Sequence, residues 1–456
     1  IFGALCACRQ GKRIMEIRLS EHFSYGKLLR FTFPSVAMML FCSIYGMVDG
    51  FFVSNYVGAT QFAALNLIWP YTMVLGAVGF MIGSGGTALV SKTLGEGKPK
   101  LANEYFSMMI YAAIVIGLFL DILGLSLMRP VARLMGADGE LLEYAVQYGN
   151  IIMAAMPTFM LQCVFQPFMV TAERARLGLW FTVASGLTNM FFDWLFIGVF
   201  GWGIRAAAAA TVLSQVVGFA LPMIYFLRRN NSLLRLGRPS TDMRAFFKAC
   251  SNGMSELVTN LSISLVGMLY NQRLLLLAGE NGVNAYGVIS YVSYLFLAMF
   301  LGYSMGISPV VGFNYGARNR PELRSLRRKS IVLLSLAALV VGTAGLCFSD
   351  SIASFFADGD LEFRDMAARA FRLYSFSYFL SHYNIFASAF FTALNNGKVS
   401  AVISFSRTIL LQVGAILLLP CVLGLDGIWL AMPLSELLCS LLSFILFQAY
   451  RRRYGY

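Results

Sequence analysis

Long apolar stretches separated by short polar segments recur along the whole chain. Many of them reach about 20 residues, the length at which an α-helix crosses a bilayer, and the alternation typical of membrane β-strands does not govern the sequence. The pattern therefore predicts an all-α integral membrane protein with twelve transmembrane helices. We place these helices at residues 31–54, 62–89, 105–127, 145–171, 179–200, 206–227, 250–277, 284–311, 331–348, 366–394, 401–423 and 427–449.

Composition and charge agree with a membrane location. The chain is 58% hydrophobic and 12% charged, which is more apolar surface than a soluble fold can bury. Its net charge of +13 does not predict nucleic-acid binding, because Lys and Arg lie between the apolar stretches and not on one polar face. Basic residues gather in segments that share one side of the membrane, chiefly Arg228, Arg229, Arg235, Arg238, Arg244, Lys248, the range 318–329 and Arg451, Arg452 and Arg453. This bias predicts a multi-pass protein of the plasma (inner) membrane with both termini in the cytoplasm.

The two halves of the chain resemble each other. At an offset of 221, residues 33–101 align with 254–322 without a gap, and glycines coincide at Gly58/Gly279 and Gly95/Gly316. Near the end we expect the offset to become 224, pairing Gly203 with Gly427. A repeat of six helices places both halves in the membrane in the same direction, as two lobes related by a pseudo-two-fold axis along the membrane normal. The cleft between the lobes is then the expected substrate path.

This repeat predicts the domain organisation. We expect an N-terminal cytoplasmic segment at 1–30, of which 1–14 are candidate upstream sequence before a start at Met15, followed by a first lobe at 31–227, a basic linker at 228–249, a second lobe at 250–449 and a basic tail at 450–456. Eight scattered cysteines show no metal-site spacing, and the glycine-rich run 83–87 lacks a nucleotide-binding pattern. We therefore expect no enzyme activity, no cofactor, and no metal beyond a possible Na⁺. The energy source would be an ion gradient or a separate subunit.

Two aspartates inside the predicted helices are candidate ion-binding groups. A carboxylate at this depth costs about 3 kcal/mol, so it needs a partner, a water-filled cavity or a function. Asp49 follows Tyr45 by four residues and Asp193 follows Asn189 by four, which places each pair on one helical face. With Thr211 of the sixth helix they offer the oxygen ligands that suit H⁺ or Na⁺. The alternative is that both aspartates are hydrogen-bonded packing groups. Neither has a counterpart in the second half.

Four other polar residues are candidates for the substrate cleft. Gln162 and Gln166 form an i, i+4 pair in the fourth helix, where they could equally hold helices together. Glu256 and Asn260 lie near the start of the seventh helix, where Glu256 would attract a cationic substrate or else face the cytoplasmic interface. The expected partners are cationic or amphiphilic small molecules and the lipid bilayer, and we expect a monomer.

Several short motifs, in this order, resemble the multidrug and toxic-compound extrusion (MATE) family of bacterial transporters, from about Met15 to the C-terminus. They are Pro34 with 48–53 ahead of Gly58, the range 83–97, the range 189–193 followed by Gly203 and 206–211, and the range 302–316. The resemblance implies export from the cell by alternating access of the two lobes.

The resemblance also implies roles for individual residues. In one branch of the family the cation site lies in the first lobe, and its residues match Tyr45, Asp49, Asn189, Asp193 and Thr211 here. Pro34 matches the proline at which the first helix is proposed to bend. A second branch uses a Glu deep in the seventh helix and an Asp in the tenth. The present chain departs from that pattern, because Glu256 lies several residues too early and the tenth helix carries only Asp365 at its outer edge.

The sequence thus predicts an antiporter, coupled to H⁺ or Na⁺, that exports cationic or amphiphilic molecules. One alternative is a flippase for lipid-linked precursors in the same superfamily, which would need a cationic cleft. Few basic residues lie inside the predicted helices, namely Arg273, Arg369, Arg372 and Arg407. The other alternative is a solute importer of the major-facilitator type.

Overall fold

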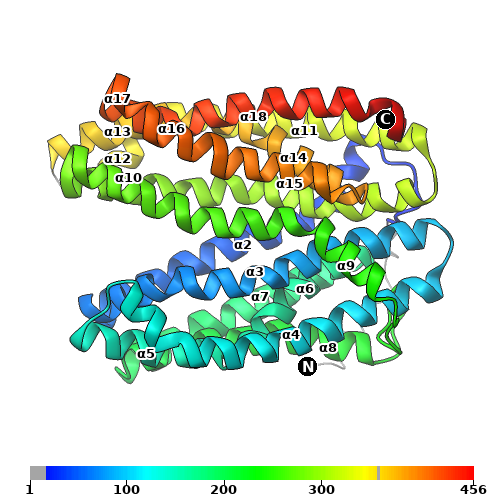
Figure 1. The fold of residues 1–456 in the computed structure, drawn as a ribbon, viewed down its shortest axis with the longest axis horizontal. Coiled ribbons are helices and arrows are strands. Elements are labelled where there is room, and N and C mark those ends of the chain that lie inside the picture. The colour runs from blue at the N-terminus through cyan, green and yellow to red at the C-terminus, as the bar shows by residue number, and fades with distance from the viewer. Residues whose placement is uncertain (1–16, 357–359) are drawn as a thin grey trace, which may run out of the picture.

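The structure, a computed structural model, describes residues 17–356 and 360–456, and every regular element in these two ranges is helical (Figure 1). In the first half the helices are α2 (Tyr25–Tyr56), α3 (Ala59–Gly95), α4 (Pro99–Leu134), α5 (Gly139–Met153), α6 (Met156–Thr171), α7 (Ala175–Asp193), the π-helical η1 (Trp194–Val199) and α8 (Ile204–Leu227). In the second half they are α9 (Met243–Asn252), α10 (Met254–Gly316), α11 (Arg320–Cys347), α12 (Ser349–Phe356), α13 (Leu361–Ser375), α14 (Tyr378–Ala393), α15 (Gly397–Phe405), η2 (Ser406–Leu411), α16 (Gln412–Leu418), α17 (Pro420–Leu423) and α18 (Leu425–Tyr454).

Some helices of the bundle are broken or joined. Helices α5 and α6 form one span bent by 54°, and the pair α13 and α14 is interrupted at Phe376 and Ser377. Helix α10 is 63 residues long, but the backbone turns back at Gly279, where φ is 62°. With α10 counted as two spans and each broken pair as one, the described chain crosses the membrane twelve times. The predicted all-α class with two lobes is confirmed.

The two lobes lie side by side, α3 to α8 in one bundle and α10 to α18 in the other (Figure 1). Each lobe has its own buried apolar core, one running from Val53 to Ala249 along the chain and the others formed mainly by second-half residues. The start of the chain is an exception. Leu19, Phe23 and Phe31 are buried in a core of the second lobe, so the N-terminal part of α2 packs across the boundary between the lobes.

The internal repeat is visible in the backbone. Gly203 and Gly424 precede α8 and α18 with φ of 67° and 57°, a conformation that glycine adopts without a steric penalty. These two residues are 221 apart, like the turn residues Gly58 and Gly279. The expected change of offset to 224 was wrong, because Gly427 lies inside α18. The repeat therefore aligns Gly203 with Gly424, which both have positive φ, and does not align Gly203-Ile204 with Gly427-Ile428.

A reciprocal contact joins the lobes, and we call it the crossed-glycine contact. A Cβ atom at Gly95 of α3 would lie 2.0 Å from the carbonyl oxygen of Phe313, and one at Gly316 of α10 would lie 2.0 Å from the carbonyl oxygen of Lys92. Only glycine permits backbones to approach this closely. Because Lys92 and Phe313 are also 221 residues apart, each lobe makes the same contact to the other.

An extended segment before α2 crosses the same end of the bundle, and we call residues 17–24 the N-terminal strap. The amide of Leu19 donates to Glu173 Oε1 at 2.6 Å in the first lobe. The amide of Phe23 donates to Glu322 Oε1 at 3.0 Å in the second lobe, and His22 Nδ1 lies 2.5 Å from Glu322 Oε2. The strap therefore ties the two lobes together beside the crossed-glycine contact.

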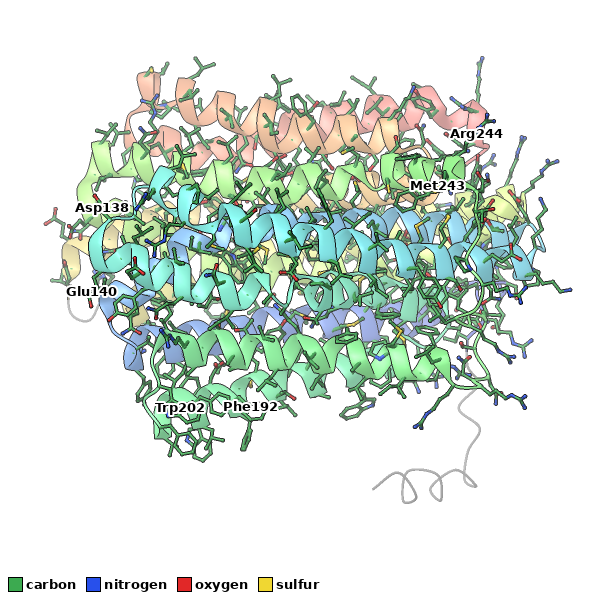
Figure 2. The ribbon with its side chains drawn as sticks, turned by 60° about the horizontal axis from the view of Figure 1, so that its bottom comes forward. Asp138, Glu140, Phe192, Trp202, Met243 and Arg244 are labelled. Carbon is green, nitrogen blue, oxygen red and sulfur yellow. The ribbon has the colours of Figure 1, made fainter. Side chains whose placement is uncertain are left out.

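Charge divides the two ends of the bundle. Nitrogen-tipped side chains crowd the end that carries Arg244, whereas Asp138 and Glu140 lie at the opposite end (Figure 2). We call these the basic end and the acidic end. Between them the surface is apolar, with large exposed side chains such as Ile122, which is 71% exposed, and Val340, which is 69% exposed. A belt of this kind suits the hydrocarbon core of a bilayer.

Candidate ion-binding site in the first lobe

Helices α2 and α7 bring two carboxylates together. Helix α2 supplies Tyr45 and Asp49, one turn apart, and α7 supplies Asn189 and Asp193 at its last two turns. The helices approach closely because Gly186 has no side chain, and a Cβ atom there would lie 2.9 Å from the Tyr45 ring. The i, i+4 spacing seen in the sequence therefore becomes one shared face between two helices.

The paired carboxylates lack the partners that burial normally requires. Asp49 lies within interaction range of both Asp193 and Asn189. Asp193 is 0% exposed and Asn189 is 2% exposed. Within the described chain, Oδ1 of Asp49, Nδ2 of Asn189 and both carboxylate oxygens of Asp193 are buried without a hydrogen-bond partner. Two adjacent buried carboxylates cannot both stay ionised unless a cation neutralises them, and otherwise one of them holds a proton. The site is chemically suited to bind H⁺ or a small hard cation.

Sequence reasoning missed Tyr148 of α5. Its side chain is buried, only 2% exposed, and lies within electrostatic range of both Asp49 and Asp193. Tyr45 likewise lies near Asp49 and near the thiols of Cys42 and Cys163. The sequence contains Tyr144 one turn before Tyr148 on α5, but the Tyr144 hydroxyl donates to Glu140. Only the packing of the helices shows which of the two tyrosines lies near the aspartates.

The hydroxyl of Thr211 is bonded within its own helix. It donates to the carbonyl of Ala207 at 3.1 Å. Among the described contacts none joins Thr211 to Asp49 or Asp193. The structure therefore brings Tyr45, Asn189 and the two aspartates together, and the role of Thr211 stays a prediction.

The two glutamines of α6 face the interior of the first lobe. Gln162 donates to Ser185 Oγ at 3.3 Å, and Gln166 approaches Cys42 Sγ at 3.6 Å. Both line a small cavity among α6, α7 and α8. All three helices belong to the first lobe, so in this conformation the cavity is internal to that lobe and separate from the surface between the lobes.

Glu256 and Asn260 lie on the first two turns of α10. The amide of Asn260 donates to the backbone carbonyl of Glu256 at 2.8 Å, and both residues are partly exposed. Their position near the start of α10 is consistent with either function predicted for Glu256.

Pro34 is buried inside α2, which continues through it as one helix from Tyr25 to Tyr56. A bend at Pro34 stays a prediction.

The second lobe has no equivalent of the unpaired carboxylates among its described residues. Opposite Asp49 in the repeat lies Tyr270, which stacks on Tyr286 with ring centroids 4.5 Å apart. Two carboxylates are buried in the described part of the second lobe, Glu322, which accepts from the strap, and Glu436. Arg407 pairs with Glu436, and its Nε and Nη2 both donate to Glu436 Oε1 at 2.8 and 2.6 Å. The amide of Asn384 also donates to Glu436 Oε2. A carboxylate satisfied in this way does not need an added cation.

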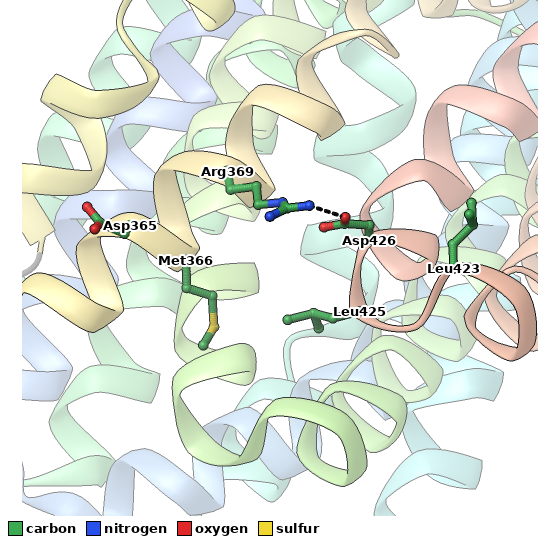
Figure 3. Close-up of a pocket in the computed structure, with 6 residues that line it drawn as sticks. All are labelled: Asp365, Met366, Arg369, Leu423, Leu425 and Asp426. Atoms are coloured by element: carbon green, nitrogen blue, oxygen red, sulfur yellow. Dashed lines mark hydrogen bonds and ion pairs between the residues drawn. The ribbon is translucent and has the colours of Figure 1, made fainter.

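A separate hollow opens at the acidic end of the second lobe, with a volume of about 490 Å³ (Figure 3). Its lining residues come from α13, α17 and α18. They are Asp365, Met366, Arg369, Leu423, Leu425 and Asp426. Arg369 and Asp426 form an ion pair across it. This hollow contains none of the candidate site residues.

The two-lobed bundle of twelve spans, with unpaired carboxylates buried in one lobe, defines an integral membrane transporter. The MatE family model matches residues 34–195 and 257–417, one match in each lobe. The chain therefore belongs to the MATE family.

Curated relatives and solved structures agree with this membership. The multidrug export protein MepA of Staphylococcus haemolyticus (strain JCSC1435) is 22% identical over 447 residues, covering 95% of each chain. MepA of Staphylococcus aureus (strain MSSA476) is 20% identical over 432 residues, covering 93% of this chain and 94% of that protein. A MATE structure in complex with MaL6 superposes with a TM-score of 0.91 at 22% identity, covering 96% of this chain and 98% of the other. An outward-facing multidrug resistance MATE family transporter of the MOP superfamily gives 0.91 at 22% identity, covering 98% and 100%. The two solved structures therefore have the same fold as this chain.

Proposed function

We propose that this protein is an ion-coupled antiporter that exports cationic or amphiphilic small molecules in exchange for H⁺ or Na⁺. The observation that carries the proposal is that Asp49 and Asp193 lie together in the first lobe with buried carboxylate oxygens that lack hydrogen-bond partners in the described chain. The MepA relatives are multidrug export proteins, and extending this function to the present chain is part of the proposal.

The arrangement of the lobes supports alternating access. With the basic end in the cytoplasm, the crossed-glycine contact and the strap close the cytoplasmic side of the bundle. A cation on Asp49 and Asp193 would stabilise one arrangement of α2 and α7, and a substrate between the lobes would stabilise the other. Antiport follows when the two ligands have different affinities for the two arrangements.

The flippase alternative is less well supported. Recognition of a lipid-linked phosphate requires free cationic side chains in the path. Three of the candidate arginines are instead neutralised, Arg369 by Asp426, Arg372 by Asp350 and Arg407 by Glu436. Their arrangement favours structural ion pairs over a phosphate site.

Transport in proteoliposomes tests the proposal. A pH gradient and a Na⁺ gradient are imposed separately, and efflux of a cationic dye is followed for the wild type, Asp49→Asn, Asp193→Asn and the control Asp121→Asn in α4. We expect one gradient to drive efflux, and each site variant to lower its rate by about a hundredfold, as for the loss of an essential proton-transfer group. Efflux by Asp49→Asn at the wild-type rate would overturn the assignment.

A further inference from the structure

The buried face of α7 is polar from the carboxylate site toward the basic end. Asp193, Asn189, Ser185 and Thr182 follow one another at intervals of three or four residues, and all are buried. Such spacing makes one continuous stripe along a helix. The opposite face of α7 is apolar and exposed, as shown by Trp180 at 68%. A buried polar stripe in a membrane helix is expensive unless it is hydrogen-bonded or hydrated.

The stripe is connected to neighbouring helices by hydroxyl groups. Ser185 Oγ accepts from Gln162 Nε2 at 3.3 Å and lies 2.7 Å from the carbonyl oxygen of Ser214, to which it donates. The Ser185 and Ser214 hydroxyls are 3.1 Å apart, and either can be the donor. Hydroxyl groups that can exchange donor and acceptor roles are suited to pass a proton.

A second row of polar groups leaves the same site on the side of α2. The hydroxyl of Tyr45 lies near Asp49 and interacts with the thiol of Cys42. Cys42 in turn contacts Gln166 of α6 at 3.6 Å. This row therefore runs from one member of the carboxylate pair to Gln166.

Both rows end at one internal cavity. Gln162, Gln166 and Thr182 provide its polar wall, and Gly218 and Pro222 of α8 also line it. Pro222 has no N–H to offer the carbonyl of Gly218 four residues earlier, which leaves that acceptor free of its usual helical bond. The cavity volume is about 10 Å³, which is enough for about one water molecule with several polar partners. It is too small for a hydrated metal cation.

The cavity is close to the basic end but closed toward it. Thr182 lies two helical turns after Ala175, where α7 begins. Between them Met169 of α6 packs against Gly178, where a Cβ atom would lie 2.9 Å from Met169 Cβ. The path is therefore interrupted at one contact between α6 and α7, as a carrier requires if it is not to leak protons.

We propose that this inner cavity holds a water molecule that passes H⁺ between the Asp49 and Asp193 pair and the basic end, by way of the Tyr45 hydroxyl and the Cys42 thiol. The proton moves from the carboxyl pair through these two groups to the water, whose place Ser185 and Gln162 help to keep polar, and onward when α6 and α7 separate at Met169 and Gly178. The inference rests on the proposed antiport and specifies H⁺ as its coupling ion.

The test measures proton flux in proteoliposomes carrying an internal pH dye, after addition of a cationic substrate. Thr182→Val removes a hydroxyl from the cavity wall and changes its volume little. Thr188→Val is the matched control, because Thr188 lies on the same helix and bonds only to Ala184 of its own backbone at 2.8 Å. Substrate affinity and the thermal unfolding midpoint in detergent are measured for each variant.

We expect Thr182→Val to slow substrate-driven proton flux at least about tenfold with unchanged substrate affinity and unfolding midpoint, whereas Thr188→Val matches the wild type. Gln166→Leu should slow the flux to a similar extent. Wild-type flux in both cavity variants would overturn the relay. Coupling of the wild type to Na⁺ alone would also overturn it while leaving antiport intact. A wild type that neither gradient drives would instead contradict the proposed function itself.

Discussion

At the scale of single residues, the two lobes treat buried charge in opposite ways. Asp49 and Asp193 have buried oxygens without partners in the described chain, whereas Glu436 is satisfied by Arg407 and Asn384. The sequence predicted that Asp49 and Asp193 each lie on a polar helical face, because i, i+4 spacing can be read directly along the chain. It could not predict the ion pair, because Arg407 and Glu436 come from different helices and are joined only by the fold.

The ion pair of the second lobe makes a stability prediction. Glu436→Gln leaves the Arg407 guanidinium buried without its counter-charge, so we expect a loss of about 3–5 kcal/mol in unfolding free energy. Thermal unfolding in detergent measures the change. Glu143→Gln, which breaks the exposed pair with Arg129, is the control and should cost at most about 1 kcal/mol. Equal effects of the two substitutions would refute a special role for the buried pair.

Tyr148 offers a second test at this scale. Because its hydroxyl dipole is buried within electrostatic range of both carboxylates, we expect Tyr148→Phe to weaken affinity for the coupling ion by about tenfold. The apparent affinity is obtained from transport rates against ion concentration. Tyr144→Phe on the same helix removes a hydroxyl that contacts Glu140 and should leave that affinity unchanged.

At the scale of elements, the apolar pattern predicted the helices well but their breaks poorly. The turn at Gly279 falls between the predicted spans 250–277 and 284–311, whereas the breaks at 154–155 and 376–377 lie inside the predicted spans 145–171 and 366–394. The strap was assigned only to a cytoplasmic segment, since its partners Glu173 and Glu322 are far away in sequence. Long-range contacts of this kind have no signature in a single chain.

The carboxyl group to which the strap bonds predicts a pH effect. Burial raises the pKa of Glu173, which lies in the turn between α6 and α7, above its ordinary value. The folded protein therefore binds this proton more tightly than the unfolded chain, so the stability that Glu173 contributes is present below the ordinary value and is lost as the pH rises through the raised pKa. The thermal unfolding midpoint in detergent should accordingly fall over this pH range in the wild type and fall less in Glu173→Gln.

The crossed-glycine contact predicts a change in access. Gly95→Ala places a methyl group 2.0 Å from the Phe313 carbonyl, which requires the lobes to separate at the basic end. We expect maleimide to label Ser91→Cys at least about tenfold faster in the Gly95→Ala background, equal to about 1.4 kcal/mol. The native cysteines are replaced beforehand. Gly50→Ala is the control, because a Cβ atom there meets nothing within 4 Å. Equal labelling in both backgrounds would argue against a closed contact.

At the scale of the whole molecule, the fold was predicted more completely than the site. Twelve spans and two lobes follow from hydropathy and the 221-residue offset, which report averages over many residues. The inner cavity and Tyr148 depend on the packing of three or more helices, and single-sequence periodicity carries no information about such packing. The role of Thr211 stays a prediction, because its hydroxyl donates within its own helix and its oxygen keeps lone pairs for a cation.

The crossed-glycine contact has a consequence for the origin of the chain. Gly95 meets Phe313 in the same way as Gly316 meets Lys92, which is the isologous form of contact found in two-fold homodimers. An ancestor of half this length could thus have paired with its own copy through one surface. Fusion of the two copies then freed each to change alone, so that one could keep an unsatisfied carboxylate pair while the other replaced Asp49 by Tyr270. A symmetric dimer could not carry a carboxylate pair in one half alone.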